Sequence, residues 1–524
     1  MIGLVVSCAS NKTFDKGLAD EILEDESQAE FVEKKSPGSG YGVYYQIFPG
    51  SFCDSNGDGI GDIRGIISKL DYINDGNLAS NRSLHADGIW LTPIHPSRSY
   101  HKYDVMDYMA IDRSFGTMED FEEFIAGCGK RNIKVIIDLV LNHTSAEHPW
   151  FLAARRGDKK YMGYYNIADA KLSEKYRPLG YGGKFYEAIF WEQMPDLNLD
   201  SPEVRKEIES IVNFWIGKGV AGFRLDAVLF YDPQQQKGID FLTWFTSYCK
   251  LVKSDIYMVG EVWDTPGVIL NFYESQIPSL FNFTFAQEKG LLPIAVTTQN
   301  GNNISTAMVN WNKIIKEKNK GAIDAIFLSN HDHNRSAGYF NQDPVKMKMA
   351  AALYLTMPGN PFVYYGEEIG MTGAGRDDNK RGPMIWSVKS RAGITRGPIG
   401  MDQRWKALAG VEENLRDPAS LTRFYIEAIR LRNQYPVLFN GMPEELTPAQ
   451  GEKKDRAIAA WTVENEEIKI AVAHNLSAAE KKLEIANAAA LCGTLTAGTS
   501  ELKPSLLGTV LSLPPFSTAL VAIE

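Results

Sequence analysis

The fold follows from Gly222-Phe223-Arg224-Leu225-Asp226-Ala227, an apolar segment that ends on an acid. Residues 220–225 predict a short buried strand after a helix over residues 205–218. Because side chains alternate along a strand, Arg224 and Asp226 share one face. An arginine beside a carboxylate holds it ionised and oriented, as a covalent nucleophile requires. A structural ion pair would show the same pattern, so this stretch alone does not define a function.

Three more apolar runs end on polar side chains. They are Val135 to His143, which closes on Asn142-His143; Tyr257 to Trp263, which carries Glu261; and Ile323 to Asp332, which closes on Asn330-His331-Asp332. Four buried strands that each present polar groups at their carboxyl ends are typical of a (β/α)8 TIM barrel with its active site at that face.

In this order, the four segments resemble the four sequence regions of the α-amylase family of glycoside hydrolases, family 13. The resemblance covers residue 41 to the C-terminus. The segment Met194-Pro195-Asp196-Leu197-Asn198 is similar to the corresponding segment of a group of bacterial α-amylases that is intermediate between oligo-1,6-glucosidases and neopullulanases. The resemblance to the family implies a TIM barrel with an inserted subdomain after strand three and a C-terminal all-β sandwich.

The rest of the chain can be divided on this basis. The other barrel strands are expected within residues 42–48, 86–94, 279–285 and 361–368, and helix 421–434 closes the barrel. Residues after His143 lack strand–helix alternation and are too many for an ordinary connection. From about Pro443 short alternating strands predict a sandwich. The expected parts are a tether over 1–40, the barrel over 41–143 and 199–440, subdomain B over 144–198, and the β-sandwich over 441–524.

Composition limits the partners. The chain has 524 residues, too many for one core, and a net charge of −10 from 65 acidic and 55 basic residues. This balance argues against nucleic acid or an anionic polymer and is compatible with a neutral substrate. The resemblance implies an α-glucan as the substrate, and we expect the protein to be a monomer.

The resemblance assigns roles to residues at matching positions. Retaining hydrolysis of a glycosidic bond needs a nucleophile and a proton donor about 5–5.5 Å apart. These are expected to be Asp226 and Glu261, the latter with a raised pKa, with Asp332 as the third catalytic acid. The expected substrate-binding residues are Tyr103, which stacks under the reacting ring, His143 and His331 on its hydroxyls, Arg224, and the pair Asp377 and Arg381 on the non-reducing side.

A loop after the first strand predicts a calcium site. In Asp54-Ser55-Asn56-Gly57-Asp58-Gly59-Ile60-Gly61-Asp62, oxygen ligands recur at every second position. An EF-hand is excluded because its twelfth position would be Gly65 rather than Glu. The better comparison is the calcium loop of many α-amylase-family members, with ligands from Asp54, Asn56, Asp58, Asp62 and the carbonyl of Ile60. A metal-free loop of Asx turns is the alternative, and a second calcium site at Asn142 and Asp196 stays open.

The N-terminus indicates a location outside the cytoplasm. Leu4-Val5-Val6-Ser7-Cys8 resembles the end of a bacterial lipoprotein signal without its charged start and most of its apolar core. This predicts a lipid anchor at Cys8 and a start further upstream; an accidental match is the alternative. The polar, acidic residues that follow, up to Gly40, predict a tether. The other cysteines (Cys53, Cys128, Cys249 and Cys492) show no metal spacing and no disulfide framework.

The resulting hypothesis is endo-hydrolysis of α-1,4-glucosidic bonds in starch, glycogen or maltooligosaccharides. Leu229-Phe230 replaces the Lys-His pair that animal and fungal α-amylases carry near the leaving group, which puts binding on that side in question. An exo-acting α-glucosidase or a transglycosylase is the alternative in the same class. A non-catalytic glucan-binding lipoprotein is the alternative in another class, and the intact Asp226, Glu261 and Asp332 speak against it.

Overall fold

The computed structural model of the chain describes residues 38–402, 406–446, 454–499 and 501–524. Its centre is an eight-stranded parallel sheet in the order β10-β11-β1-β2-β3-β7-β8-β9. A parallel bridge between Phe281 and Ala325 joins the two ends and closes the barrel. The strands are β1 (Tyr44–Ile47), β2 (Gly88–Leu91), β3 (Lys134–Leu139), β7 (Gly222–Leu225), β8 (Tyr257–Gly260), β9 (Ser279–Leu280), β10 (Ala325–Phe327) and β11 (Asn360–Tyr364).

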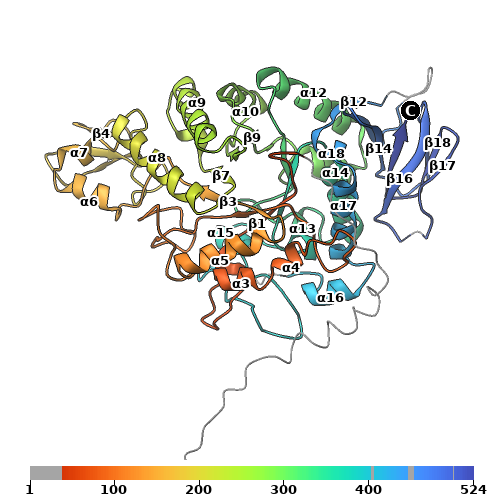
Figure 1. The fold of residues 1–524 in the computed structure, drawn as a ribbon, viewed down its shortest axis with the longest axis horizontal. Helices are drawn as coiled ribbons and strands as arrows, with labels where there is room; N and C mark the ends of the chain where they lie inside the picture. The colour runs from red at the N-terminus through yellow and green to blue at the C-terminus, as the bar shows by residue number, and fades with distance from the viewer. Residues whose placement is uncertain (1–37, 403–405, 447–453, 500) are drawn as a thin grey trace, which may run out of the picture.

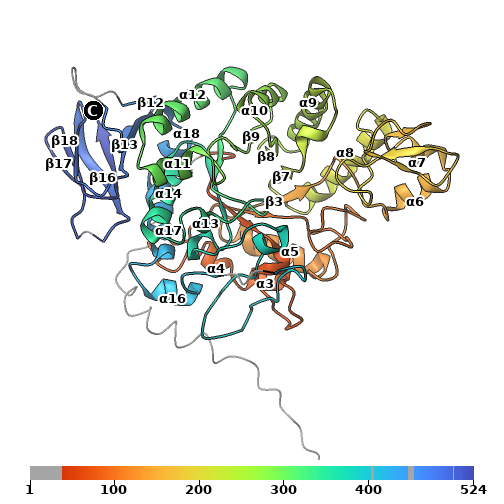
Figure 2. The ribbon, with the colours of Figure 1, turned by 180° about the vertical axis from the view of Figure 1, so that it is seen from behind.

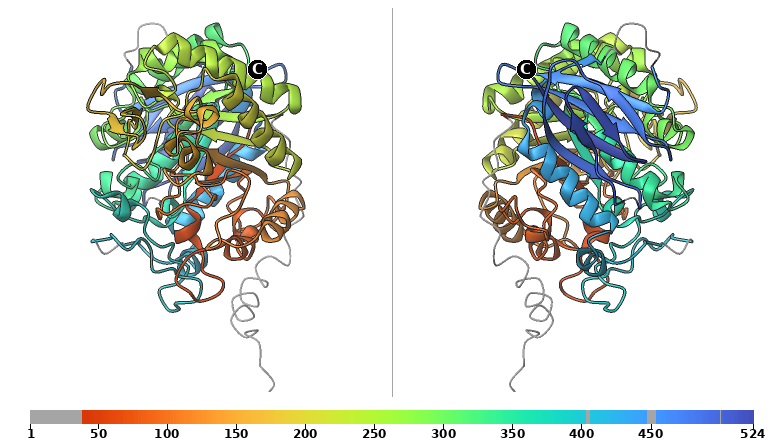
Figure 3. Two further views of the ribbon diagram at one scale, coloured as in Figure 1. Left: turned by 90° about the vertical axis from the view of Figure 1, so that its left-hand side faces the viewer. Right: turned by 90° about the vertical axis from the view of Figure 1, so that its right-hand side faces the viewer.

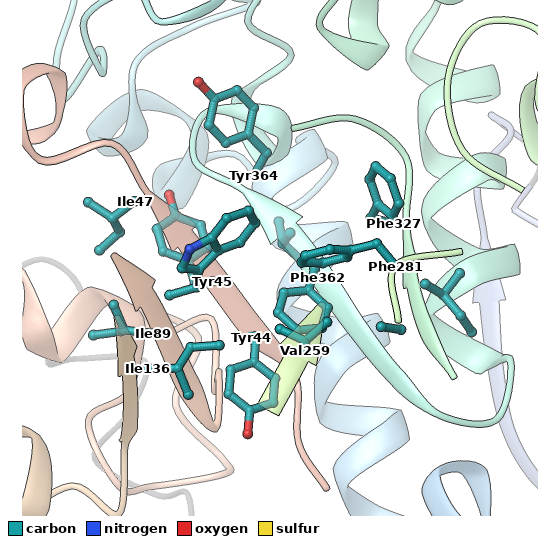
Figure 4. Packing of buried hydrophobic residues seen from close by; sticks show 14 of the residues in the cluster. Tyr44, Tyr45, Ile47, Ile89, Ile136, Val259, Phe281, Phe327, Phe362 and Tyr364 are labelled. Carbon is teal, nitrogen blue, oxygen red and sulfur yellow. The ribbon is translucent and has the colours of Figure 1, made fainter. Parts of the chain in front are cut away.

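Every residue of β1, β2, β7, β8, β10 and β11 is buried, as expected for strands covered on both faces. The core contains aromatic contacts: the Tyr44 ring stacks 5.0 Å from both Tyr257 and Phe362, and the Phe281 ring meets Phe362 edge to face at 4.9 Å. Figure 4 shows Tyr44, Phe281 and Phe362 among aliphatic residues of neighbouring strands, such as Ile136 and Val259.

Helices surround the barrel, as Figures 1 and 2 show. The longer ones are α5 (Met118–Gly129), α8 (Pro202–Gly217), α9 (Gln235–Val252), α12 (Asn302–Lys318), α14 (Pro344–Thr356) and α17 (Leu421–Gln434). Local sequence sets several of their starts: Thr117 and Asp120 form a capping box before α5, and the Ser201 hydroxyl caps α8 ahead of Pro202.

The segment between β3 and α8 projects from one end of the molecule (Figure 1). It holds α6 (Pro149–Arg155), α7 (Lys159–Met162) and a three-stranded sheet of β4 (Ile167–Ala168), β5 (Tyr176–Pro178) and β6 (Phe185–Glu187). Its chain returns to the barrel through an antiparallel bridge between His143 and Asp196. The insertion therefore contributes directly to the rim above β3.

The C-terminal strands form a separate layer at the opposite end, seen face-on in Figure 3. A five-stranded sheet, β12-β13-β14-β19-β16, is accompanied by a three-stranded sheet, β15-β18-β17. The bounds are β12 (Met442–Glu445), β13 (Ile458–Glu464), β14 (Lys469–Asn475), β15 (Lys481–Glu484), β16 (Ala488–Thr496), β17 (Ser505–Leu507), β18 (Val510–Leu513) and β19 (Ser517–Ile523). Their pairings are antiparallel, so the predicted TIM barrel with an inserted subdomain and a C-terminal all-β sandwich is confirmed.

Two details differ from the sequence-based expectation. Strand six ends at Leu280, well before Phe285, because Asn282 already turns to donate its N–H to the Ala325 carbonyl. Helix α8 begins at Pro202, three residues before the predicted start.

The structure describes four of the five cysteines and little of the expected N-terminal tether. Cys8 and most of the expected tether lie outside the described residues. The other four cysteines, Cys53, Cys128, Cys249 and Cys492, are free thiols. Within the described ranges, no helix has both the length and the apolar character needed to cross a membrane.

Candidate active site

Three acids meet at the carboxyl ends of the barrel strands. Asp226 follows β7, Glu261 follows β8, and Asp332 follows β10. All three line one cavity of about 480 Å³. The position is the one where TIM barrels place their reactive groups. The strands can lie this close because Gly222 has no side chain: a Cβ there would stand 1.8 Å from the Tyr257 carbonyl oxygen.

Arg224 holds the two central acids. Its Nη1 donates to Asp226 Oδ1 at 2.6 Å and to Asp138 Oδ1 at 2.9 Å. Its Nη2 lies 3.0 Å from Glu261 Oε2, an ion-pair distance without hydrogen-bond geometry. The guanidinium is fully buried among these carboxylates, and together they raise its pKa despite its burial. One fixed positive charge therefore orients both acids.

Glu261 has the electrostatics of a proton donor. Burial raises its pKa to about 8, and the neighbouring Asp226 and Asp332 add to this shift, while Arg224 opposes it. Glu261 Oε2 accepts the Ala227 N–H at 3.0 Å and faces Arg224, so the proton belongs on Oε1. At neutral pH the group is then an acid with a proton to give.

The pH dependence of the reaction should report this acid. For the free enzyme, kcat/KM should fall as pH rises through about 8, because deprotonated Glu261 cannot protonate a leaving group. The measurement is kcat/KM between pH 5 and 10 for maltoheptaose, a member of the expected α-glucan substrate class. An aryl α-maltotrioside whose phenol departs without protonation is the control and should show a much flatter alkaline limb. Identical alkaline limbs for both substrates would contradict the assignment.

The other two acids are held by different neighbours. Burial raises the pKa of Asp226, and Arg224 opposes that shift most strongly. Burial also acts to raise the pKa of Asp332, but His331 and Arg381 outweigh it and bring the pKa below its usual value. Asp332 accepts from Arg381 Nη2 at 2.8 Å and lies 3.0 Å from His331 Nε2. Asp332 is thus a permanent anion facing the cavity.

A chain of hydrogen bonds from Gln46 through His331 and Tyr103 to Asp138 fixes the buried side of the site. The Gln46 amide lies 2.8 Å from His331 Nδ1, and because an amide nitrogen only donates, Nε2 must carry the imidazole proton. Nε2 lies 2.5 Å from the Tyr103 hydroxyl, which in turn donates to Asp138 Oδ2 at 3.1 Å. The Tyr103 and His331 rings stack 5.6 Å apart. This chain holds the Tyr103 ring against one wall, and its stacking role stays a prediction.

His143 lies at the same rim. Its side chain is buried and lines the cavity, and its Nε2 has no hydrogen-bond partner among the described residues. Burial lowers its pKa to about 4, so the ring is neutral at physiological pH. A buried, unpaired polar atom at a cavity wall suits a ligand hydroxyl.

Both members of the predicted pair Asp377 and Arg381 line the cavity, and they differ in burial. Arg381 is buried and joins the acid cluster through Asp332, while its Nη1 donates to the Tyr100 hydroxyl at 2.8 Å. Asp377 lies at the rim with a 59% exposed side chain, 3.9 Å from Arg381. Asp377 also accepts from Lys380 Nζ at 2.8 Å, so it stands at the exposed edge of the cavity beside the buried Arg381.

The groups that position Arg381 were not predicted from the sequence. The consecutive carbonyls of residues 380–382 each accept from a buried side chain. Arg335 Nε and the Tyr364 hydroxyl donate to the first, Ser51 Oγ to the second and the Tyr365 hydroxyl to the third. Asp138 and Gln46, polar residues inside apolar strands, were also not predicted to belong to the hydrogen-bonded chain that holds Tyr103 and His331. Their strand positions were the only signal available.

The predicted calcium loop lies beside the barrel as a chain of Asx turns. Asp54 accepts the N–H groups of Asn56, Gly57 and Gly59, and Asp58 accepts that of Ile60. Asp62 accepts from Ser55 and Gly65 and caps the next helix, α3 (Ile63–Ile67). In the described part of the chain no three or more His, Cys, Asp or Glu side chains form a group that could hold a metal ion. At the second candidate site, Asn142 donates to Asp196 at 3.0 Å.

Comparisons with known sequences agree with this geometry. The family model described as "Alpha amylase, catalytic domain" matches residues 46–441. Alpha-amylase 3 of Dictyoglomus thermophilum is 39% identical over 459 residues, covering 85% of this chain and 86% of that protein. An oligo-1,6-glucosidase of Parageobacillus thermoglucosidasius is 32% identical over 487 residues, covering 76% and 84%.

Solved structures of similar proteins have the same fold. Eubacterium rectale Amy13B superposes with a TM-score of 0.88 at 37% identity, covering 94% of this chain and 97% of that one. An alpha-amylase from H. orenii superposes with a TM-score of 0.82 at 35% identity, covering 93% and 100%. The likeness spans the barrel, the inserted segment and the C-terminal sheets.

Proposed function

Because the chain belongs to the α-amylase family of glycoside hydrolases, we propose that it hydrolyses internal α-1,4-glucosidic bonds of starch, glycogen or maltooligosaccharides with retention of configuration. Asp226 attacks the anomeric carbon, and Glu261 protonates the departing oxygen and then deprotonates the incoming water. Asp332 stabilises the reacting ring.

The observation that carries this proposal is the shared guanidinium. Arg224 contacts both Asp226 and Glu261, so the two carboxyl groups are close neighbours. Retaining enzymes need about 5–5.5 Å between them, whereas inverting enzymes leave about 6.5–9.5 Å for a water. The relative named alpha-amylase at 39% identity supports the choice of α-1,4-glucans.

A product time course on soluble starch and maltoheptaose tests the proposal. We expect mixed oligosaccharides early in the reaction, with products released as α-anomers. The oligo-1,6-glucosidase relatives favour a second candidate, an exo-acting α-glucosidase. Glucose alone from the start would support that candidate, and products longer than the substrate would indicate transglycosylation. β-Anomers would overturn the retaining mechanism.

We also propose that the loop from Asp54 to Asp62 binds calcium. Its donors are hard oxygens only, and the backbone bonds described above turn them into one tight loop, with Gly57 and Gly59 at positive φ. The loop pairs with residues 393–396 through Asp54 N–H to the Gly393 carbonyl and Arg396 N–H to the Gly59 carbonyl. Calcium would therefore stabilise the contact between two irregular segments and take no part in the reaction.

Chelation should lower the melting temperature by about 2–3 °C, and calcium should restore it. The estimate is the roughly 2.7 kcal/mol that a ligand at a hundredfold excess over its Kd adds to the folded state. Asp58→Ala should abolish the calcium response. Asp75→Ala, which alters an Asx turn elsewhere, is the control and should keep it. Untreated protein without calcium by elemental analysis would refute the site.

For location, we propose an extracytoplasmic protein, membrane-anchored through lipid at Cys8 or secreted. Protein from its native cells should carry lipid on Cys8 and partition with membranes, and Cys8→Ser should release it. Cys492→Ser, at a partly exposed cysteine, should leave partitioning unchanged. A wholly soluble protein with unmodified Cys8 would end the lipoprotein proposal and leave the enzymatic one intact.

A further inference from the structure

Lys102 is an unusual lysine between two residues of the active-site cavity. Its neighbours His101 and Tyr103 both line the cavity, whereas Lys102 is not one of the lining residues. Its side chain is only 12% exposed, although lysine is almost never buried unless it is paired. Its backbone φ is 67°, in the left-handed region that a residue with a Cβ rarely adopts. Both features are unfavourable by themselves, so other contacts must hold Lys102 in place.

A buried ion pair holds the lysine. Its Nζ lies 2.8 Å from Asp112 Oδ2 and donates to the Ser97 carbonyl at 3.4 Å. Asp112 is itself fixed, because its N–H donates to the Ile94 carbonyl at 2.8 Å and its Oδ1 accepts from the Ser114 hydroxyl at 2.6 Å. The ion pair therefore ties Lys102 to a well-anchored part of the segment that follows β2.

The backbone conformation of Lys102 decides how its two neighbours lie, because it sets the direction of the chain between them. With φ at 67°, the Tyr103 N–H reaches His101 Nδ1 and donates to it at 3.1 Å. The two rings then stand 5.9 Å apart, tilted by 37°. The Lys102 N–H donates to the Ser99 hydroxyl at 3.1 Å and closes the same turn. The turn at Lys102 therefore fixes the mutual orientation of two cavity-lining rings.

The intrinsic preference of the residue at position 102 opposes this turn. A residue with a Cβ favours other backbone conformations over the left-handed one by roughly five- to thirtyfold. Glycine adopts positive and negative φ about equally. Loss of the ion pair should therefore disturb the turn strongly when the residue at this position has a Cβ, and only weakly when it is glycine.

We propose that Lys102 is a positioning residue for the reaction; this rests on the proposed function. Its ion pair with Asp112 holds the turn that directs His101 and Tyr103 into the cavity. The Tyr103 hydroxyl also lies 2.5 Å from His331 Nε2, so a displaced turn would loosen the wall against which the reacting ring is expected to stack. Lys102 acts only through these neighbours, since its own amine faces Asp112.

Two substitutions of Lys102 test the proposal. Lys102→Ala removes the ion pair and keeps a Cβ, so kcat/KM on maltoheptaose should fall about five- to thirtyfold. Lys102→Gly also removes the ion pair but tolerates the turn, so kcat/KM should stay within about twofold of the wild type. Lys481→Ala removes an ion pair with Asp455 in the C-terminal β-sandwich; it is the control and should leave kcat/KM unchanged. The proposal is overturned if Lys102→Ala is as active as the wild type, or if Lys102→Gly is as impaired as Lys102→Ala.

Crystal structures of the two variants give a second readout that needs no activity. In Lys102→Gly, φ at this position should stay positive and the Tyr103 N–H should still donate to His101. In Lys102→Ala, φ should be negative and that hydrogen bond should be lost. An unchanged turn in Lys102→Ala would contradict the proposal even if the activity falls. A wild type that does not cleave maltoheptaose would instead count against the proposed function, and the two structures would still test the role of the ion pair in holding the turn.

Discussion

Asp226→Asn is expected to reduce kcat on maltoheptaose by at least about 10⁴-fold, the order of loss seen when an enzyme is deprived of its covalent nucleophile. The amide keeps the shape of the side chain but cannot form the glycosyl ester. Arg224 keeps Asp138 and Glu261 as partners, so the fold should persist. Circular dichroism and the melting temperature serve as controls, and a kcat within tenfold of the wild type would remove Asp226 from this role.

Substitution of Asp226 by the smaller alanine gives a second test of its role as the nucleophile. Asp226→Ala opens space behind the anomeric carbon, where azide can replace the missing carboxylate. With a donor that carries a good aryl leaving group, azide should restore turnover and yield a β-glycosyl azide, because a single displacement inverts the α-configuration. Formation of the α-azide would show that another group still acts as nucleophile.

Much of this arrangement could be predicted because it depends on local patterns. A buried parallel strand is a run of apolar residues, and a polar residue at its carboxyl end marks the active face, as at Asp226, Glu261 and Asp332. Helix α17 was predicted over Leu421–Gln434, as observed, because its amphipathic period is uninterrupted. These signals are read from a few consecutive residues.

What could not be predicted depends on contacts between distant residues. Strands β4, β5 and β6 have only two or three residues each, too few for a period to appear. The bond from Ser51 to the Arg381 carbonyl spans 330 residues. The proximity of Phe190 to Phe230 likewise depends on how the insertion returns to the barrel.

The structure also shows where the unusual pair Leu229-Phe230 lies. Leu229-Phe230 replaces a charged and polar pair of other α-amylases, which put leaving-group binding in question. The structure places Phe230 against Phe190 and in the same cavity lining as Trp263. The replacement therefore exchanges hydrogen-bonding groups for ring faces.

Glu261→Gln is expected to lower kcat/KM on maltoheptaose by about 10²–10⁴-fold, the range for loss of a general acid–base group. Its Ala227 contact can be kept by the amide oxygen, so the loop from Ala227 to Phe230 should stay in place. A donor with a good aryl leaving group needs no protonation, and its first step should be nearly unaffected.

The second step then separates Glu261 from Asp226 in one experiment. Without Glu261 to deprotonate water, the glycosyl ester on Asp226 should accumulate and be detectable by mass spectrometry of the intact protein. Azide needs no general base, so it should release that ester and yield an α-glycosyl azide, since two displacements retain the configuration. The variants at Asp226 and Glu261 should therefore give azides of opposite configuration from the same donor. If Glu261→Gln gave the β-azide, or lost no activity on maltoheptaose, the proton donor would have to be another group in the cavity.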